Sequence, residues 1–217
     1  MPAHILPLYV VCDQSYSMAD HMDALNGRLV ELLRALRADP ALAASVRFGL
    51  IGFSETARIV VPLAVAGEGA GQPVATTGAE SNFAAAFTLL RHTIQRDVDS
   101  LVAASYVVGR PVVCFVSDGQ PTDPAMWPSA HAELVDRDWP VRPRLVAVGL
   151  GEVDRTTIGR IGTHRAYPGG TETGLWEAVR EFAGDFGAPS QDAGPNRRLP
   201  RLRHRRVGCT TLERDPR

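Results

Sequence analysis

Three short runs of almost unbroken apolar residues constrain the fold of this chain more than any other feature. They span residues 6–12, 112–116 and 145–150. A strand with one face in water alternates apolar and polar side chains, whereas a strand covered on both faces is apolar at nearly every position. The three runs therefore predict central strands of a parallel sheet with helices on both faces.

The segments between these runs carry the spacing of amphipathic helices. Long apolar stripes cover residues 22–36, ended by an Asp-Pro pair, and residues 83–101. Weaker or shorter stripes lie at residues 126–135, 156–161 and 175–186. Strands that alternate with helices in this way predict a doubly wound α/β fold with a mostly parallel sheet.

One pair of strands breaks this alternation. Residues 46–53 and 58–63 both have strand-like composition, and only four residues separate them. A parallel crossover needs roughly a dozen residues, so these two strands are expected to pair as an antiparallel hairpin. We predict that the hairpin provides one antiparallel strand at the edge of the sheet.

We predict one domain over residues 1–187 and a separate tail over residues 188–217. The tail holds eight arginines against three acidic residues and has no apolar periodicity. This composition indicates a disordered segment, or one that a partner orders. Docking on an acidic surface is an alternative. Contact with nucleic acid is less favoured, because no aromatic residues for base stacking lie among the arginines.

The composition excludes several chemistries. All 23 basic residues are arginine, so the chain has no Walker phosphate loop, no kinase lysine and no Schiff-base amine. The histidines and the three cysteines show no His-x-x-x-His or Cys-x-x-Cys spacing for a transition metal. No apolar run approaches a membrane span, and the first residues lack a secretory signal. We therefore expect a cytoplasmic protein with reduced cysteines and no membrane association.

Acidic residues follow two of the apolar runs. The first run leads into Asp-Gln-Ser-Tyr-Ser at residues 13–17, and the second into Ser-Asp-Gly at residues 117–119. Ligands of open parallel sheets bind beyond the carboxyl ends of the strands. If these strands are neighbours, the carboxylates of Asp13 and Asp118 face each other and need a cation or a shared proton. Carboxylates with the hydroxyls of Ser15 and Ser17 favour a hard divalent ion, Mg²⁺ or Mn²⁺.

Structural roles remain open for the same residues. Aspartate and serine before a helix are favoured N-caps, and an aspartate before a glycine is typical of a turn. We expect Asp123 to cap the helix that follows it. If Asp13 and Asp118 end their strands in register, Cys12 and Cys114 point to opposite faces of the sheet and cannot form a disulfide.

The Asp-x-Ser-x-Ser pattern at residues 13–17 resembles the metal-ion-dependent adhesion site of von Willebrand factor A (VWA) domains. The stretch Ser-Asp-Gly-Gln-Pro-Thr-Asp at residues 117–123 is similar to the family's sequence around a further metal-binding aspartate. The resemblance covers about residues 5–187 and implies a VWA fold. It also implies metal ligands, which are Asp13, Ser15, Ser17, Asp118 and a hydroxyl from a later loop. Counting six residues back from Phe87 assigns that hydroxyl to Ser81, with Thr76 and Thr77 as alternatives.

The opening Leu-Pro-x-Tyr-x-x-x-Asp-x-Ser-x-Ser-Met at residues 6–18 is similar to that of small bacterial stand-alone VWA proteins associated with tellurium resistance. This resemblance implies a binding domain in a stress or defence system, linked to a Ser/Thr kinase and a PP2C-type phosphatase. A protein partner would supply an Asp or Glu carboxylate to the metal. We expect loops 14–20, 67–82 and 120–127 to give specificity, with Trp127 either anchoring the partner or packing beneath its helix.

An enzyme is the alternative interpretation, namely a metal-dependent phosphatase or other hydrolase with Asp13 as its nucleophile. Haloacid-dehalogenase-type phosphatases begin with Asp-x-Asp after a strand, but residue 15 is serine here, and the lysine of that family is missing. The Gly-x-Ser-x-Gly turn of serine hydrolases is absent as well. We therefore predict that the chain is not an enzyme.

Overall fold

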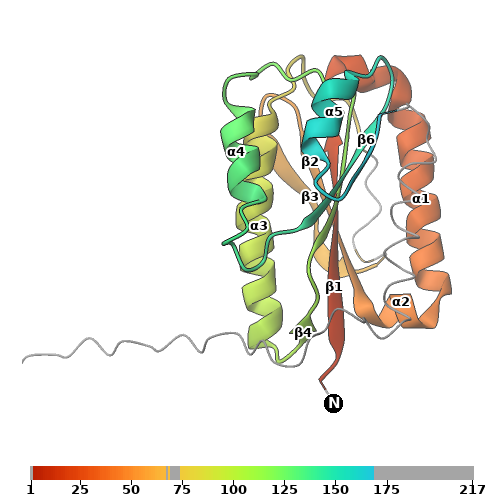
Figure 1. Ribbon diagram of the computed structural model, residues 1–217. Coiled ribbons are helices and arrows are strands. Elements are labelled where there is room, and N and C mark those ends of the chain that lie inside the picture. The colour runs from red at the N-terminus through yellow and green to blue at the C-terminus, as the bar shows by residue number, and fades with distance from the viewer. Residues whose placement is uncertain (1, 67, 69–73, 169–217) are drawn as a thin grey trace, which may run out of the picture.

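The computed structural model describes residues 2–66, 68 and 74–168, and in this part of the chain a seven-stranded sheet lies between two layers of helices (Figure 1). The predicted helix at residues 175–186 and the tail at residues 188–217 lie outside the described residues. The strands are β1 (His4–Asp13), β2 (Val46–Phe53), β3 (Ala57–Val65), β4 (Val107–Val108), β5 (Val112–Ser117), β6 (Arg144–Gly149) and β7 (Arg165–Tyr167).

The sheet has the order β3-β2-β1-β5-β6-β7, and the two-residue β4 pairs with the start of β1. The strands pair in parallel except for β2 and β3, which form the expected antiparallel hairpin at one edge. The predicted fold class is confirmed. Because the chain builds outward from β1 in both directions, the carboxyl ends of β1 and β5 lie at the switch point of the strand order, where ligands bind in such folds.

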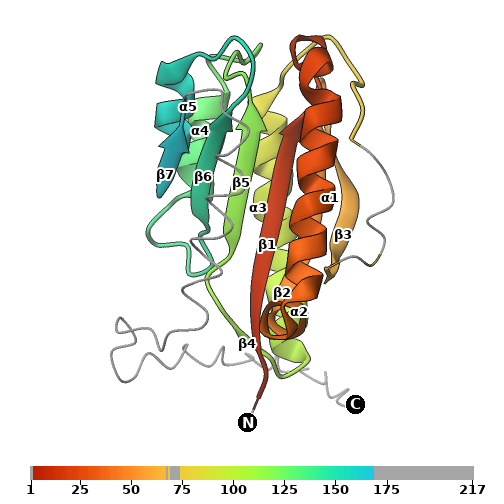
Figure 2. The same ribbon diagram turned by 90° about the vertical axis from the view of Figure 1, so that its right-hand side faces the viewer.

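Helices cover both faces of the sheet. Helix α1 (Met22–Ala38) packs on one face, while α3 (Phe83–Ala103), α4 (Trp127–Leu134) and α5 (Arg155–Ile161) pack on the other (Figure 2). The core under α1 is mostly aliphatic, and the core under α3 contains a group of aromatic rings. Trp127 belongs to this second core and is only 3% exposed, so it packs beneath its helix.

Short elements complete the chain and were not predicted. A 3₁₀ helix, η1 (Tyr16–His21), connects β1 to α1, and α2 (Pro40–Ser45) follows α1 directly. The Asp-Pro pair that ends α1 also starts α2, because the Asp39 carboxylate accepts hydrogen bonds from the backbone N–H groups of Ala41 and Leu42.

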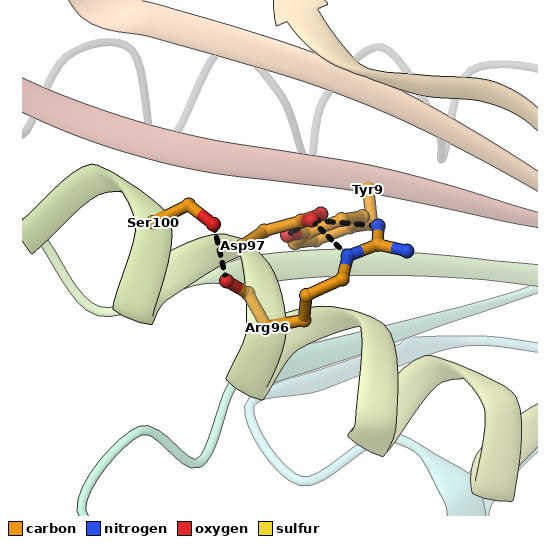
Figure 3. Close-up of polar contacts among 4 residues, drawn as sticks. All are labelled: Tyr9, Arg96, Asp97 and Ser100. Atoms are coloured by element: carbon orange, nitrogen blue, oxygen red, sulfur yellow. Dashed lines mark hydrogen bonds and ion pairs between the residues drawn. The ribbon is translucent and has the colours of Figure 1, made fainter. Parts of the chain in front are cut away.

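A polar contact fixes α3 to the middle of the sheet (Figure 3). The buried Tyr9 hydroxyl on β1 donates a 2.9 Å hydrogen bond to the Asp97 carboxylate on α3. Arg96 binds the other oxygen of Asp97 from the solvent side. Burial raises the pKa of Tyr9 well above its usual range, and the negative charge of Asp97 adds to that shift. Tyr9 is therefore a permanent donor at this position.

The register of β1 and β5 corrects one prediction. Val10 pairs with Cys114, and Cys12 pairs with Val116, so Asp13 is level with Ser117 and not with Asp118. Cys12 and Cys114 consequently lie on the same face of the sheet and in the same apolar core. The prediction that the two thiols point to opposite faces was wrong, because it assumed a register shifted by one residue. Both are free thiols in the structure.

Candidate metal centre

The carboxylates of Asp13 and Asp118 lie together at the carboxyl ends of two neighbouring strands. Asp13 is the last residue of β1, and Asp118 follows β5 directly. The hydroxyl of Ser117 is 2.7 Å from Asp13 Oδ2 and 3.5 Å from Asp118 Oδ1, so a single oxygen contacts both carboxylates. Asp13 is fully buried and Asp118 is 2% exposed.

Hydrogen bonds hold Asp13 in place from three directions. Its Oδ2 atom accepts from the hydroxyls of Ser81 at 2.6 Å and Ser117 at 2.7 Å. Its Oδ1 atom accepts from the backbone N–H of Ser15 at 3.0 Å. Burial raises the pKa of the Asp13 carboxyl, and the serine hydrogen bonds oppose this shift. The carboxylate is thus costly to bury and is stabilised by neutral donors alone.

Asp118 is satisfied on only one side. Its Oδ1 atom accepts the backbone N–H of Gln120 at 2.9 Å, but its Oδ2 atom is buried and has no hydrogen-bond partner among the described residues. Neither Asp118 nor Asp13 forms an ion pair with any residue that the structure describes. A buried carboxylate oxygen without a partner costs free energy, and a cation beside it would remove that cost.

The remaining serines lie in the same turn as Asp13. The Ser15 hydroxyl is 3.1 Å from the hydroxyl of Ser17. Ser15 is buried, and Ser17 is exposed at the edge of the site. The turn leads into η1 and is fixed by an isolated bridge between Ser15 and Gly78. The structure therefore brings together all five residues proposed from the sequence as ligands: Asp13, Ser15, Ser17, Ser81 and Asp118.

The alternatives to Ser81 have other surroundings. The Thr77 hydroxyl pairs with the Ser54 hydroxyl at 3.1 Å, and Thr77 is exposed. Thr76 is partly buried and makes no side-chain hydrogen bond to the described residues. Asn82, and not Ser81, caps α3, because its side chain accepts the backbone N–H of Ala85 at 2.9 Å. The Ser81 hydroxyl is thus committed to Asp13 and has no capping role.

Two further contacts lock the Ser81 segment to the loop after Asp118. Ser81 and Thr122 form two reciprocal bonds, in which Thr122 N–H donates to the Ser81 carbonyl and Ser81 N–H donates to the Thr122 hydroxyl. The Asp123 carboxylate accepts the backbone N–H groups of Phe83 and Ala84 at the start of α3. Asp123 therefore caps the preceding helix α3 by its side chain, which corrects the prediction that it caps the following one.

Two features show why this loop has its shape. Gly119 adopts φ +80°, and a Cβ there would lie 2.9 Å from the Asp154 carbonyl oxygen. Only glycine turns the chain so closely after Asp118. On the α3 side, the rings of Phe53, Phe83 and Phe115 meet with centroids 5.1 to 5.6 Å apart. They join the end of β2, the start of α3 and β5 into one rigid support beside the site.

Sequence reasoning missed Ser117 and the true role of Asp123. Ser117 was hidden because the assumed register set Asp118, one residue later, opposite Asp13. Aligning the ends of the two apolar runs, at residues 12 and 116, would have placed Ser117 level with Asp13. Asp123 has no comparable signal, because its partners lie forty residues earlier in the chain.

The donor set fits a hard cation. No group of three or more His, Cys, Asp or Glu side chains that could hold a metal exists in the described ranges, so a cation here depends on two carboxylates and serine hydroxyls. Oxygen donors of this kind suit Mg²⁺ or Mn²⁺. Metals that prefer thiolate or imidazole ligands do not suit this donor set.

None of the helices in the described residues is long and apolar enough to span a membrane.

Comparison with known proteins supports the fold. No protein-family model matches the sequence, and no curated protein matches it. Among solved structures, the chain is similar to proximal thread matrix protein 1 (PTMP1) from the mussel byssus, with a TM-score of 0.60 and 15% identity over 86% of this chain and 49% of that one. This chain thus spans about half the length of PTMP1. A second structure of PTMP1 has a zinc-occupied MIDAS motif, the abbreviation of the metal-ion-dependent adhesion site.

Two further structures are similar. BatB from Bacteroides thetaiotaomicron has a TM-score of 0.55 and 12% identity over 83% of this chain and 99% of BatB. The manganese-loaded TRAP protein of Plasmodium vivax has a TM-score of 0.54 and 15% identity over 82% of this chain and 73% of TRAP. These proteins contain VWA domains. Together with the strand order and the antiparallel edge, the likeness shows that this chain has a VWA-like fold.

Proposed function

We propose that this domain binds Mg²⁺ or Mn²⁺ through Asp13, Ser15, Ser17, Ser81 and Asp118, and that it uses the metal to bind a protein partner. The observation that carries this proposal is the Oδ2 atom of Asp118, which is buried beside a second buried carboxylate and has no hydrogen-bond donor among the described residues. Two similar structures support it, since PTMP1 has zinc in its MIDAS and TRAP is loaded with manganese.

The geometry supports binding through a shared cation. Two buried carboxylates without a counter-charge destabilise each other, and a divalent ion offsets both. When bound, the ion would supply positive charge and an open coordination position for an incoming Asp or Glu carboxylate. The chain's own residues orient the site: Ser81 and Ser117 hold Asp13, and the N–H of Gln120 holds Asp118.

The enzyme alternative has less support from the geometry. A nucleophilic aspartate needs an oxygen that substrate can approach, but Asp13 is fully buried and both of its oxygens accept hydrogen bonds. The resemblance to tellurium-resistance-associated proteins extends the proposal to a cytoplasmic stress or defence system, in which the carboxylate comes from a Ser/Thr kinase or a PP2C-type phosphatase.

Calorimetric titration of the full chain with Mg²⁺ and Mn²⁺ after EDTA treatment tests the proposed site. We expect saturable binding by the wild type and its loss in Asp118→Asn, which keeps the shape of the side chain and removes its charge. Asp20→Asn is the matched control, because Asp20 is an exposed acid in the adjoining η1. Equal binding by wild type and Asp118→Asn would refute the proposed ligand set.

A pull-down experiment tests whether the metal takes part in partner binding. Candidate partners, including a Ser/Thr kinase and a PP2C-type phosphatase, are bound to the immobilised wild-type chain in Mg²⁺. The complexes are then washed with EDTA. We expect release by EDTA and no capture by Asp118→Asn. A Mg²⁺-dependent phosphatase activity that is lost with Asp13→Asn would instead support the enzyme alternative.

A further inference from the structure

A second polar site lies at the opposite end of the sheet. The segments before β5, before β6 and before β7 line a cavity of about 560 Å³ that is open to solvent on one side. Its polar lining is formed by four arginines, a threonine and a histidine: Arg110, Arg137, Arg142, Arg144, Thr163 and His164. No acidic residue of the described chain lines it. This volume is in the range of pockets that hold small ligands.

Backbone carbonyls hold the guanidinium groups of Arg110 and Arg142 in place. Arg110 donates from Nε to the Arg142 carbonyl at 3.0 Å and from Nη2 to the Pro143 carbonyl at 3.1 Å. Arg142 in turn donates from Nη1 to the Arg137 carbonyl. Because a guanidinium has five N–H donors, each of these two side chains keeps donors for a ligand while its position is fixed.

Electrostatics makes the cluster a receptor for anions. Partial burial lowers the pKa of Arg110, and the positive charges of Arg142 and Arg144 lower it further. Arg110, Arg137 and Arg142 form no ion pair within the described part of the chain. An anion in the cavity would therefore relieve repulsion among charges that the fold already holds together.

We propose that this cavity binds a phosphate group. Arginine forks match the tetrahedral oxygens of phosphate, and a phosphate monoester offers three acceptor oxygens and nearly two negative charges. A carboxylate offers only two oxygens and one charge, which a single arginine can satisfy. The cavity is separate from the candidate metal centre, so this inference does not depend on the proposed function.

Binding of inorganic phosphate and of a short phosphoserine peptide to the full chain, titrated by calorimetry at matched ionic strength, tests the proposal. We expect saturable binding of at least one probe, weakened about tenfold in Arg110→Gln and about fivefold in Arg137→Gln. The Arg137 guanidinium makes no hydrogen bond or ion pair to the described residues, so Arg137→Gln decides the question if Arg110→Gln does not fold. Arg137→Lys keeps the charge without the fork and should bind with intermediate affinity.

Arg58→Gln provides the matched control, because Arg58 is an exposed arginine on β3, at the far edge of the sheet. Its effect should stay below about twofold, as expected for screened surface charge. Tighter binding of the phosphopeptide than of free phosphate, with none by the unphosphorylated peptide, identifies a phosphorylated chain as the source. Equal binding identifies free phosphate. Absence of saturable binding, or an equal loss in Arg58→Gln and Arg110→Gln, overturns the proposal.

Discussion

The two ends of strand β5 carry opposite charges in different settings. At the carboxyl end, Asp118 and its neighbour Asp13 are buried and depend on hydroxyl and N–H donors from other segments. At the amino end, Arg110 is exposed and is held by the backbone carbonyls of residues 142 and 143. The acidic end is thus part of the folded interior, whereas the basic end is placed on its surface. Substitutions at the two ends should therefore have different consequences.

The largest expected effect is at the acidic end. Asp13→Asn removes one of two buried charges, so we expect the affinity for Mg²⁺ to fall by about a hundredfold, or about 2.7 kcal/mol. The melting temperature in EDTA should hold or rise, because the uncompensated charge is removed. Calorimetry and thermal unfolding measure the two quantities. An equal loss of Mg²⁺ affinity in Arg110→Gln and Asp13→Asn would contradict the difference between the two ends.

A smaller loss is expected from Ser81→Ala. The variant removes a hydroxyl that donates to Asp13, and we expect Mg²⁺ affinity to fall about tenfold, which is about 1.4 kcal/mol. Ser81→Thr keeps the oxygen and restricts its rotation, so affinity should be retained or slightly higher. Asn82→Ala is the control: it should lower folding stability by about 1 kcal/mol and leave Mg²⁺ binding unchanged. Unchanged affinity in Ser81→Ala would make Thr76 or Thr77 the loop ligand to test.

The middle of the sheet should be independent of both ends. Tyr9→Phe deletes the hydrogen bond to Asp97, and we expect it to cost about 1 kcal/mol of folding stability in denaturant unfolding. Binding of Mg²⁺ and of phosphate should not change. Tyr106→Phe, whose hydroxyl makes no hydrogen bond to the described residues, should have no effect on stability. A change in either binding constant by Tyr9→Phe would mean that the two ends are coupled through β1 and α3.

The smallest effect concerns pH. Burial raises the pKa of Asp13 in the folded protein, so its contribution to stability is fully present below the unfolded pKa and is lost as pH rises through the folded pKa. In EDTA, the stability gained by Asp13→Asn should therefore be largest near neutral pH and shrink on acidification. The corresponding difference for Arg110→Gln should stay flat over this range, because arginine remains charged. Urea unfolding at several pH values measures both, and a gain for Asp13→Asn that is constant with pH would contradict the raised pKa.

Much of the fold follows from the sequence because its strands are buried on both faces. Continuous apolar runs marked β1, β5 and β6, and the four-residue gap marked the β2–β3 hairpin. The short elements escaped prediction, since β4 and β7 have two and three residues and no periodicity can be read from so few. In α2, a single Asp-Pro pair both ends one helix and begins another.

The sequence was enough to propose the residues of the candidate site, but not all of the hydrogen bonds among them. Asp13 ends β1, Ser15 and Ser17 come directly after it, and Asp118 follows β5. The sheet alone therefore brings these residues to one edge. Ser117 required the correct register, and a shift of one residue exchanged its position with that of Asp118. The bonds from Asp123 to the start of α3 join distant segments, and no local pattern in the sequence encodes them.

Because the register of β1 and β5 places Cys12 and Cys114 in one core, their alkylation can measure how often this part of the sheet opens. Cys12 and Cys114 are fully buried in one core, and burial raises the pKa of both thiols, so neither thiol reacts while the sheet is closed. Their alkylation in native buffer would then proceed at the rate at which β1 and β5 become exposed. Each labelled thiol records one opening event of the two strands whose ends carry the candidate metal centre.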